Sequence, residues 1–384
     1  MSYQLPSGLP ENKQLNIRSF SQLFDNMSEC YKLFWFNAIV NQVLQGKDKM
    51  TYDELINDMI AEAWYMVSEY KLNLGPADGL ELLIKYINNE TDANLKSGEK
   101  KDNIISYLEK DGYKDKNILK QKKILTLNVP YRVQAPFLCT MKGLEGWKGS
   151  PQILAERINQ HQRLIYYFNK IDGMNSEIEI DKEWFEYITT NQVIIKGWIH
   201  YNMIDYLQRR NPNVPGIINK LDAPQMRNLT KVQNFWKLIL QVEDVREIYG
   251  DLLITSNDLS IDHFVPWSYV THDELWNLSP TTRSINSSKS NNLPKWDIYF
   301  PKLSELQFKA YETIWKYEKV HDNFEKCRKE HINSDEAYIK LYRKGLSKAE
   351  FCSNLEEIIY PVYTSAYSMG FKEWKYEGSD IKLL

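Results

Sequence analysis

Apolar side chains return every three or four residues over much of this chain, which is the spacing of an amphipathic helix. The run from Ser28 to Leu44 predicts one such helix, ending near Gly46. Thr51 and Glu54 form a capping-box pattern, which predicts the start of a second helix. Further helices are expected at residues 79–87, 152–168, 183–207 and 235–242, and from 294 to near the end of the chain. The pattern therefore predicts a mainly helical protein.

Three stretches depart from this helical pattern. Residues 1–27 are polar and are expected to form an irregular arm. Residues 90–123 are rich in lysine with interleaved acids, which predicts a solvated helical face or loop; a patch that contacts a nucleic-acid backbone is the alternative. Residues 124–139 combine spaced apolar side chains with two prolines, which predicts extended segments or a buried arm.

The region from Leu259 onward has a different local pattern. Leu259–Val265 is a short apolar-rich run followed by proline, which predicts a strand. Leu278–Thr281 can form a second short strand. Thr282 or Ser284 can cap a helix that runs to about Ser290. The sequence therefore predicts a strand, a loop, a second strand and a helix, in this order.

Composition and charge narrow the classes of protein that fit. The chain has 384 residues, of which 43% are hydrophobic, so it can bury sizeable cores and is not expected to be disordered. Its formal net charge of -3 argues against a constitutive, promiscuous DNA-binding protein, which is usually basic. The charge does not argue against a nuclease that is gated by a partner or a ligand.

The cysteines and the hydropathy pattern indicate the cellular compartment in which the protein is expected. The four cysteines are scattered and form no Cys-x-x-Cys pair, so we expect reduced thiols rather than a zinc site. The N-terminus has no charged segment followed by an apolar run, and no window is long and apolar enough to span a membrane. These features predict a cytoplasmic protein without a membrane partner.

Five polar residues in the region of the two predicted strands have the chemistry of phosphodiester hydrolysis. Asp262 and Asn286 offer oxygen ligands of the kind that Mg²⁺ or Mn²⁺ prefers. His263 is suited to act as the general base near neutral pH. Asn277 can hydrogen-bond across the loop and orient the base, and Lys289 can face a phosphate. Because neighbours on a regular strand point to opposite faces, Asp262 and His263 need a bend or a loop edge to reach one site.

The residues around this site resemble the HNH endonuclease family, of the ββα-metal type. The resemblance rests on Asp262–Pro266, on Asn277 and on Asn286–Pro294, in this order and spacing. The pattern is similar to that of the HNH module in the RNA-guided CRISPR nuclease. The resemblance covers roughly residues 240–300, and the rest of the chain looks like the long helical part of some uncharacterised bacterial HNH proteins.

This resemblance implies a role for each matching residue. It makes Asp262 and Asn286 metal ligands, His263 the general base and Asn277 the residue that orders the loop. Many members of the family carry a Cys-x-x-Cys zinc knuckle just before the Asp-His pair. Here residues 246–250 contain no cysteine, so no structural zinc is predicted. The expected fold is mainly α with an embedded ββα-metal module.

The expected organisation has three parts. Residues 1–235 form a mostly helical targeting or regulatory region, residues 236–300 form the HNH module and residues 301–384 form a helical C-terminal region. The expected function is DNA cleavage with Mg²⁺ or Mn²⁺, in bacterial anti-phage defence or restriction, with an activating protein partner or a homo-oligomer. A mobile-element nickase, an RNA-cutting HNH nuclease and a catalytically inactive HNH scaffold are the alternatives. His161, His200, His321 and His331 are assigned no chemistry.

The net charge leads to a first prediction, on DNA binding. Because the chain has little general attraction for a polyanion, it should bind random duplex DNA with a Kd on the order of 10⁻⁶ M or weaker near physiological salt. Replacing the lysines between residues 96 and 123 should flatten any remaining salt dependence. A titration of the purified chain on random-sequence duplex measures both. Nanomolar, sequence-independent binding would contradict the gated interpretation.

Overall fold

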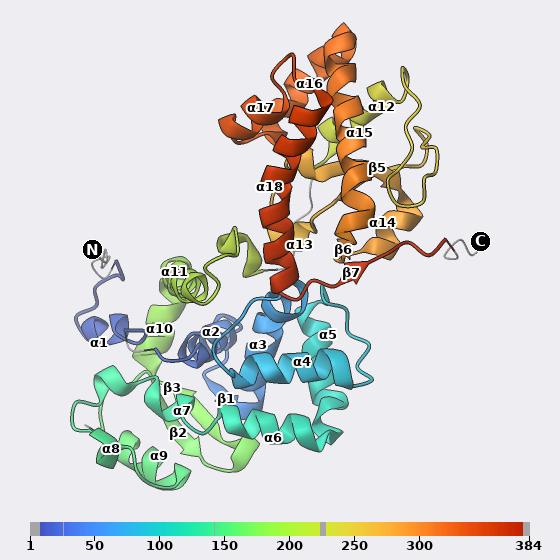
Figure 1. Ribbon diagram of the computed structural model, residues 1–384. Helices are drawn as coiled ribbons and strands as arrows, with labels where there is room; N and C mark the ends of the chain where they lie inside the picture. Colours follow the sequence, from blue (N-terminus) through green and yellow to red (C-terminus); the bar gives the residue numbers. More distant parts are fainter. Residues whose placement is uncertain (1–7, 26, 142, 223–227, 379–384) are drawn as a thin grey trace. The chain divides into compact units, whose positions relative to one another are not determined.

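The computed structural model describes residues 8–25, 27–141, 143–222 and 228–378. Within this part of the chain, helices predominate and strands are short (Figure 1). The chain divides into two compact units. The first unit comprises residues 1–212 and 220–223, and the second comprises residues 213–219 and 224–384. No helix of the described residues is both long enough and apolar enough to cross a membrane.

The first unit is built of helices around a small sheet (Figure 1). Its helices are α1 (Ile17–Ser21), α2 (Tyr31–Leu44), α3 (Tyr52–Trp64), α4 (Gly79–Glu90), α5 (Lys101–Lys110), α6 (Lys116–Leu125), α7 (Val129–Arg132), α8 (Gly143–Gly146), α9 (Pro151–Asn159), α10 (Lys182–Thr190) and α11 (Gln192–Arg210). Its strands are β1 (Lys49–Thr51), β2 (Tyr166–Lys170) and β3 (Glu177–Ile180), in the antiparallel order β1-β3-β2.

Helices α2 and α3 were predicted from their periodicity, and the structure has both. Thr51 accepts a hydrogen bond from the Glu54 amide while Glu54 bonds back to the Thr51 amide, so the capping box is formed. Most of α2 is buried, including Trp35 and Phe36. Helix α3 continues into a short π-helix at Tyr65–Glu69.

Three local predictions in the first unit were wrong. Within residues 1–27, the side chain of Asn16 caps helix α1. Phe20 of this helix stacks on Trp184, with 4.8 Å between the ring centroids. Residues 124–139 contain the helical turn α7, whose first turn tolerates Pro130, and not the extended segments that were one of the two expectations, although Val129 and Val133 are buried. The helix expected at 152–168 ends at Asn159, and β2 follows because Tyr166 and Phe168 alternate into the core. In each case, contacts distant in sequence outweighed the local pattern.

The second unit holds the motif region and the C-terminal helices (Figure 1). Its helices are α12 (Thr230–Ile239), α13 (Trp267–Val270), α14 (Arg283–Lys289), α15 (Trp296–Lys316), α16 (Glu318–His331), α17 (Asp335–Leu341) and α18 (Lys348–Ser368). Its strands are β4 (Leu259–His263), β5 (Leu278–Thr282), β6 (Leu293–Pro294) and β7 (Glu373–Trp374). The predicted order of strand, loop, strand and helix is present as β4, β5 and α14.

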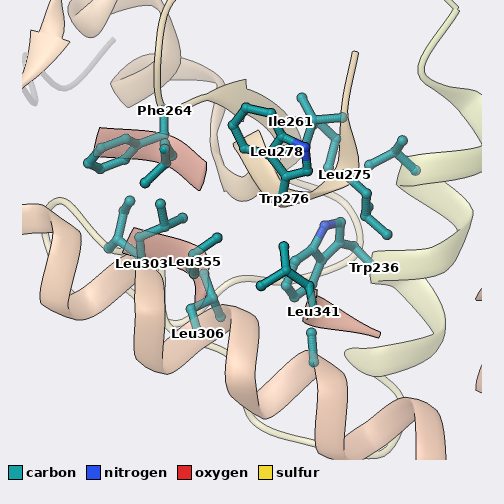
Figure 2. Close-up of a cluster of buried hydrophobic side chains, with 14 of the residues drawn as sticks. Trp236, Ile261, Phe264, Leu275, Trp276, Leu278, Leu303, Leu306, Leu341 and Leu355 are labelled. Carbon is teal, nitrogen blue, oxygen red and sulfur yellow. The ribbon is translucent and has the colours of Figure 1, made fainter. Parts of the chain in front are cut away.

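One hydrophobic core runs through the second unit. Figure 2 shows Ile261 and Leu278 of the two strands in the same cluster as Leu303 of α15, Leu341 of α17 and Leu355 of α18. The expected boundary at residues 300 and 301 therefore crosses this core rather than separating two cores. The chain also returns to the strand region at its end, because β7 pairs with β6 in parallel.

Candidate active site

A two-stranded hairpin positions the motif residues. Strands β4 and β5 pair antiparallel, with Asp262 opposite Ser279 and His263 opposite Leu278. Asp262 and His263 are both buried, with 3% and 4% of their surface exposed. His263 is the last residue of β4, and the loop that follows carries the short helix α13. His263 therefore lies where the chain leaves the regular strand.

Asn277 closes the loop between the two strands. Its Oδ1 accepts a hydrogen bond from the Val265 amide at 2.8 Å, and its Nδ2 donates to the Val265 carbonyl at 2.9 Å. Its own carbonyl accepts from the Phe264 amide at 2.8 Å. Asn277 is fully buried, so these partners satisfy polar groups that water cannot reach. The side chain therefore holds the loop just after His263, where we expected a residue that orders the loop.

Helix α14 presents two motif residues to strand β4. Thr282 caps the helix by accepting from the Ile285 amide. Asn286 and Lys289 are three residues apart and share one face of the helix. Asn286 Nδ2 donates to the Ile261 carbonyl at 3.1 Å and to Ser260 Oγ at 2.9 Å. Because Nδ2 makes both bonds, Oδ1 is the amide atom that is suited to bind a metal.

Lys289 makes the second contact from α14 to β4. Its Nζ donates to Asp262 Oδ1 at 3.1 Å and to the His263 carbonyl at 2.7 Å. The side chain is fully buried, and this burial lowers its pKa while the Asp262 carboxylate opposes the shift. We expected Lys289 to face a phosphate. In the structure its ammonium instead joins the side chain of Asp262 to the backbone of His263.

A tyrosine that the sequence analysis did not single out holds the other oxygen of Asp262. Tyr249 donates its hydroxyl to Asp262 Oδ2. Burial and the adjacent carboxylate raise the pKa of Tyr249 well above its ordinary value, so the hydroxyl keeps its proton and acts as the donor. Both oxygens of Asp262 are thus occupied by side chains, one by an ammonium and one by a phenol.

A buried carboxylate shapes the turn that delivers Tyr249. Glu247 is 1% exposed, and it accepts from the amides of Tyr249 at 2.7 Å, Gly250 at 2.6 Å and Leu252 at 3.1 Å. This turn lies where many HNH proteins are expected to carry the zinc knuckle. Here one side chain gathers three backbone donors. No local spacing rule identifies such a role, so the sequence analysis missed it.

The imidazole of His263 has an acidic partner. His263 Nε2 lies 2.7 Å from Asp273 Oδ1, and the Asp273 side chain is 21% exposed. Asp273 is ten residues further along the chain, in the loop before Asn277. The sequence alone does not indicate its role, because a single acid in a polar loop carries no signal of its own.

The donors at this site fit a hard divalent cation. Asp262 and Asn286 offer carboxylate and amide oxygens, and the Lys289 ammonium already places a positive charge against Asp262 Oδ1. Among the described residues, no group of three or more His, Cys, Asp or Glu side chains lies together as a metal cluster. A site with so few protein ligands is typical of Mg²⁺, because this ion keeps several of its waters and binds through one or two carboxylates and substrate phosphates.

Comparison with known families agrees with the motif. Residues 246–295 match the family model described as HNH endonuclease. This match begins at the Glu247 turn and includes β4, β5 and α14. This match supports an HNH-type segment within the chain. No curated protein and no solved structure matches the chain.

The Glu247 turn leads to a second prediction, on stability. Glu247→Ala should lower the free energy of unfolding of the second unit by about 2–4 kcal/mol, because three backbone amides lose a charged acceptor in a buried turn. Hydrogen exchange at the amides of Tyr249, Gly250 and Leu252 should quicken most. The exposed Asp244→Ala is the control and should change stability by no more than ~0.5 kcal/mol. Unchanged protection of those three amides in Glu247→Ala would contradict this role.

Proposed function

We propose that this protein is a metal-dependent endonuclease that hydrolyses phosphodiester bonds of DNA. The observation that carries the proposal is the joining of β4 to α14 within the segment that matches the HNH family: Asn286 bonds the Ile261 carbonyl, and Lys289 bonds the Asp262 side chain and the His263 carbonyl. In this proposal, β4, β5 and α14 are the ββα-metal module.

Each residue has a role in the proposed reaction. Asp262 and the Asn286 amide oxygen would hold Mg²⁺ or Mn²⁺, which when bound neutralises charge on the phosphoryl group and assists the leaving oxygen. His263 accepts a proton from the attacking water. Asn277 keeps the loop after His263 in place. Lys289 bonds both the Asp262 side chain and the His263 carbonyl, and so holds the two residues in fixed positions relative to α14. Lys289 donates to one oxygen of Asp262, so a cation held by this carboxylate would compete with the ammonium.

The cellular role belongs to the same proposal. The net charge of -3 gives little general affinity for nucleic acid, which supports a nuclease that an activating protein partner, a ligand or self-association switches on. A bacterial anti-phage or restriction effector is the role that we propose. A mobile-element nickase or an RNA-cutting enzyme uses the same site chemistry, and cleavage assays on supercoiled DNA, linear DNA and RNA distinguish them.

A third prediction concerns the general base. His263→Ala should lower the rate of cleavage by ~10²–10⁴-fold, because the attacking water loses its proton acceptor. Single-turnover cleavage of plasmid DNA with Mn²⁺ measures the rate, and circular dichroism checks the fold. His321→Ala, a half-buried histidine of α16, is the control and should cleave at the wild-type rate. A wild-type rate for His263→Ala would remove the base assignment, whereas no cleavage by the wild-type protein would favour an inactive scaffold.

A fourth prediction concerns the metal. Asp262→Asn and Asn286→Ala should each abolish cleavage and weaken Mn²⁺ binding as followed by electron paramagnetic resonance. Both Asn and Ala at 262 remove the counter-charge of the buried Lys289, which costs about 3–5 kcal/mol. We choose Asn because it keeps the shape of the side chain and an oxygen that can accept a hydrogen bond from Lys289. The exposed Asp258→Asn, just before β4, is the control. Unchanged Mn²⁺ binding in both variants would show that the ligands lie elsewhere.

Chelation separates a catalytic from a structural metal. EDTA should abolish cleavage and leave the melting temperature unchanged, because the Glu247 turn holds the region expected to carry a zinc knuckle in other HNH proteins. A large fall in melting temperature on chelation would reveal a structural metal.

A further inference from the structure

The loop that leads into β5 carries two acidic residues with different tasks. Asp273 directs its carboxylate to the His263 imidazole, with 2.7 Å between Oδ1 and Nε2. Glu274 is buried and accepts from Asn333, through the backbone amide at 3.1 Å and through Nδ2 at 2.7 Å. One acid therefore contacts the histidine of the motif, and its neighbour fastens the loop.

The C-terminal helices hold this loop at further points. His331, at the end of α16, places Nδ1 2.8 Å from the Asp273 carbonyl and is itself buried. Because a carbonyl only accepts, His331 Nδ1 must be the donor. Gln307 of α15 donates to the Leu278 carbonyl at 2.7 Å. These anchors lie outside the segment that matches the HNH family.

We propose that Asp273 is the positioning residue of His263, and that it sets the tautomer in which this histidine acts. A carboxylate accepts hydrogen bonds, so the contact places the imidazole proton on Nε2 and the lone pair of the neutral ring on Nδ1. This inference rests on the proposed nuclease function. In the reaction, an O–H bond of the attacking water breaks as an N–H bond forms at Nδ1. The Asp273 carboxylate stabilises the resulting imidazolium.

The anchoring of the loop explains why a partly exposed acid can serve this purpose. An aspartate in a free loop loses side-chain and backbone entropy when it holds one geometry. Here the Asp273 backbone is fixed by His331 and the next residue is fixed by Asn333, so little freedom remains to be lost. The chain beyond residue 295 therefore helps to hold the loop of the proposed active site, although it carries none of the motif.

The test uses the full chain and two independent readouts. Nitrogen-15 NMR of the histidine side chains, recorded on metal-free protein, should show His263 protonated at Nε2 in the wild type and redistributed toward Nδ1 in Asp273→Ala. Single-turnover cleavage by Asp273→Ala should be about 10- to 100-fold slower, with an unchanged Kd for DNA. The exposed Asp258→Ala, which removes an acid outside this loop, is the control. It should keep the wild-type tautomer and the wild-type rate.

Each outcome supports or overturns the proposal. If Asp273→Ala retains the wild-type tautomer, or changes it and still cleaves at the wild-type rate, Asp273 is not the positioning residue. The isosteric Asp273→Asn guards against a loss of fold, and its rate should also fall because the charge is lost. If the tautomer shifts as expected but wild-type protein cleaves neither DNA nor RNA, the contact stands and the proposed nuclease function fails.

Discussion

The buried ion pair between Lys289 and Asp262 is the constraint on which the candidate site depends. Burying two charges costs free energy unless their geometry and their remaining hydrogen bonds compensate. Here the ammonium also bonds the His263 carbonyl, and the carboxylate also accepts from Tyr249. These bonds therefore fix the position of α14 along β4. Asn286, one turn earlier on α14, is then placed beside the Ile261 carbonyl.

The sequence was sufficient for the parts of the site that depend on neighbouring residues. The apolar run ended by proline predicted β4, and Thr282 was one of the two caps considered for α14; the structure has both. The motif spacing also predicted that Asn277 orders the loop, and in the structure its side chain bonds the Val265 backbone. These features were predictable because each is encoded within about thirty residues.

Other features depend on contacts that no local pattern encodes. Glu247, Tyr249 and Asp273 were missed, because their roles arise only when strand, turn and loop come together. The same reason explains the errors in the first unit, where Phe20 becomes part of the core through Trp184, more than a hundred and sixty residues away. The burial of the Lys289 side chain was also unexpected, since lysine is rarely buried unless it is paired.

The position of the motif within the second unit follows from the same physics. Two short strands and a helix of seven residues bury too little apolar surface to be stable alone. Metal–thiolate bonds are one way to hold so small a module, and a shared core is another. In this chain, β4 and β5 pack into the core formed by α15, α17 and α18, while side chains of α15 and α16 bond the Leu275 and Asp273 carbonyls of the intervening loop. The stability of the motif is thereby coupled to helices that contribute none of its residues, so a core substitution far from Asp262 acts on the site through the packing of β4.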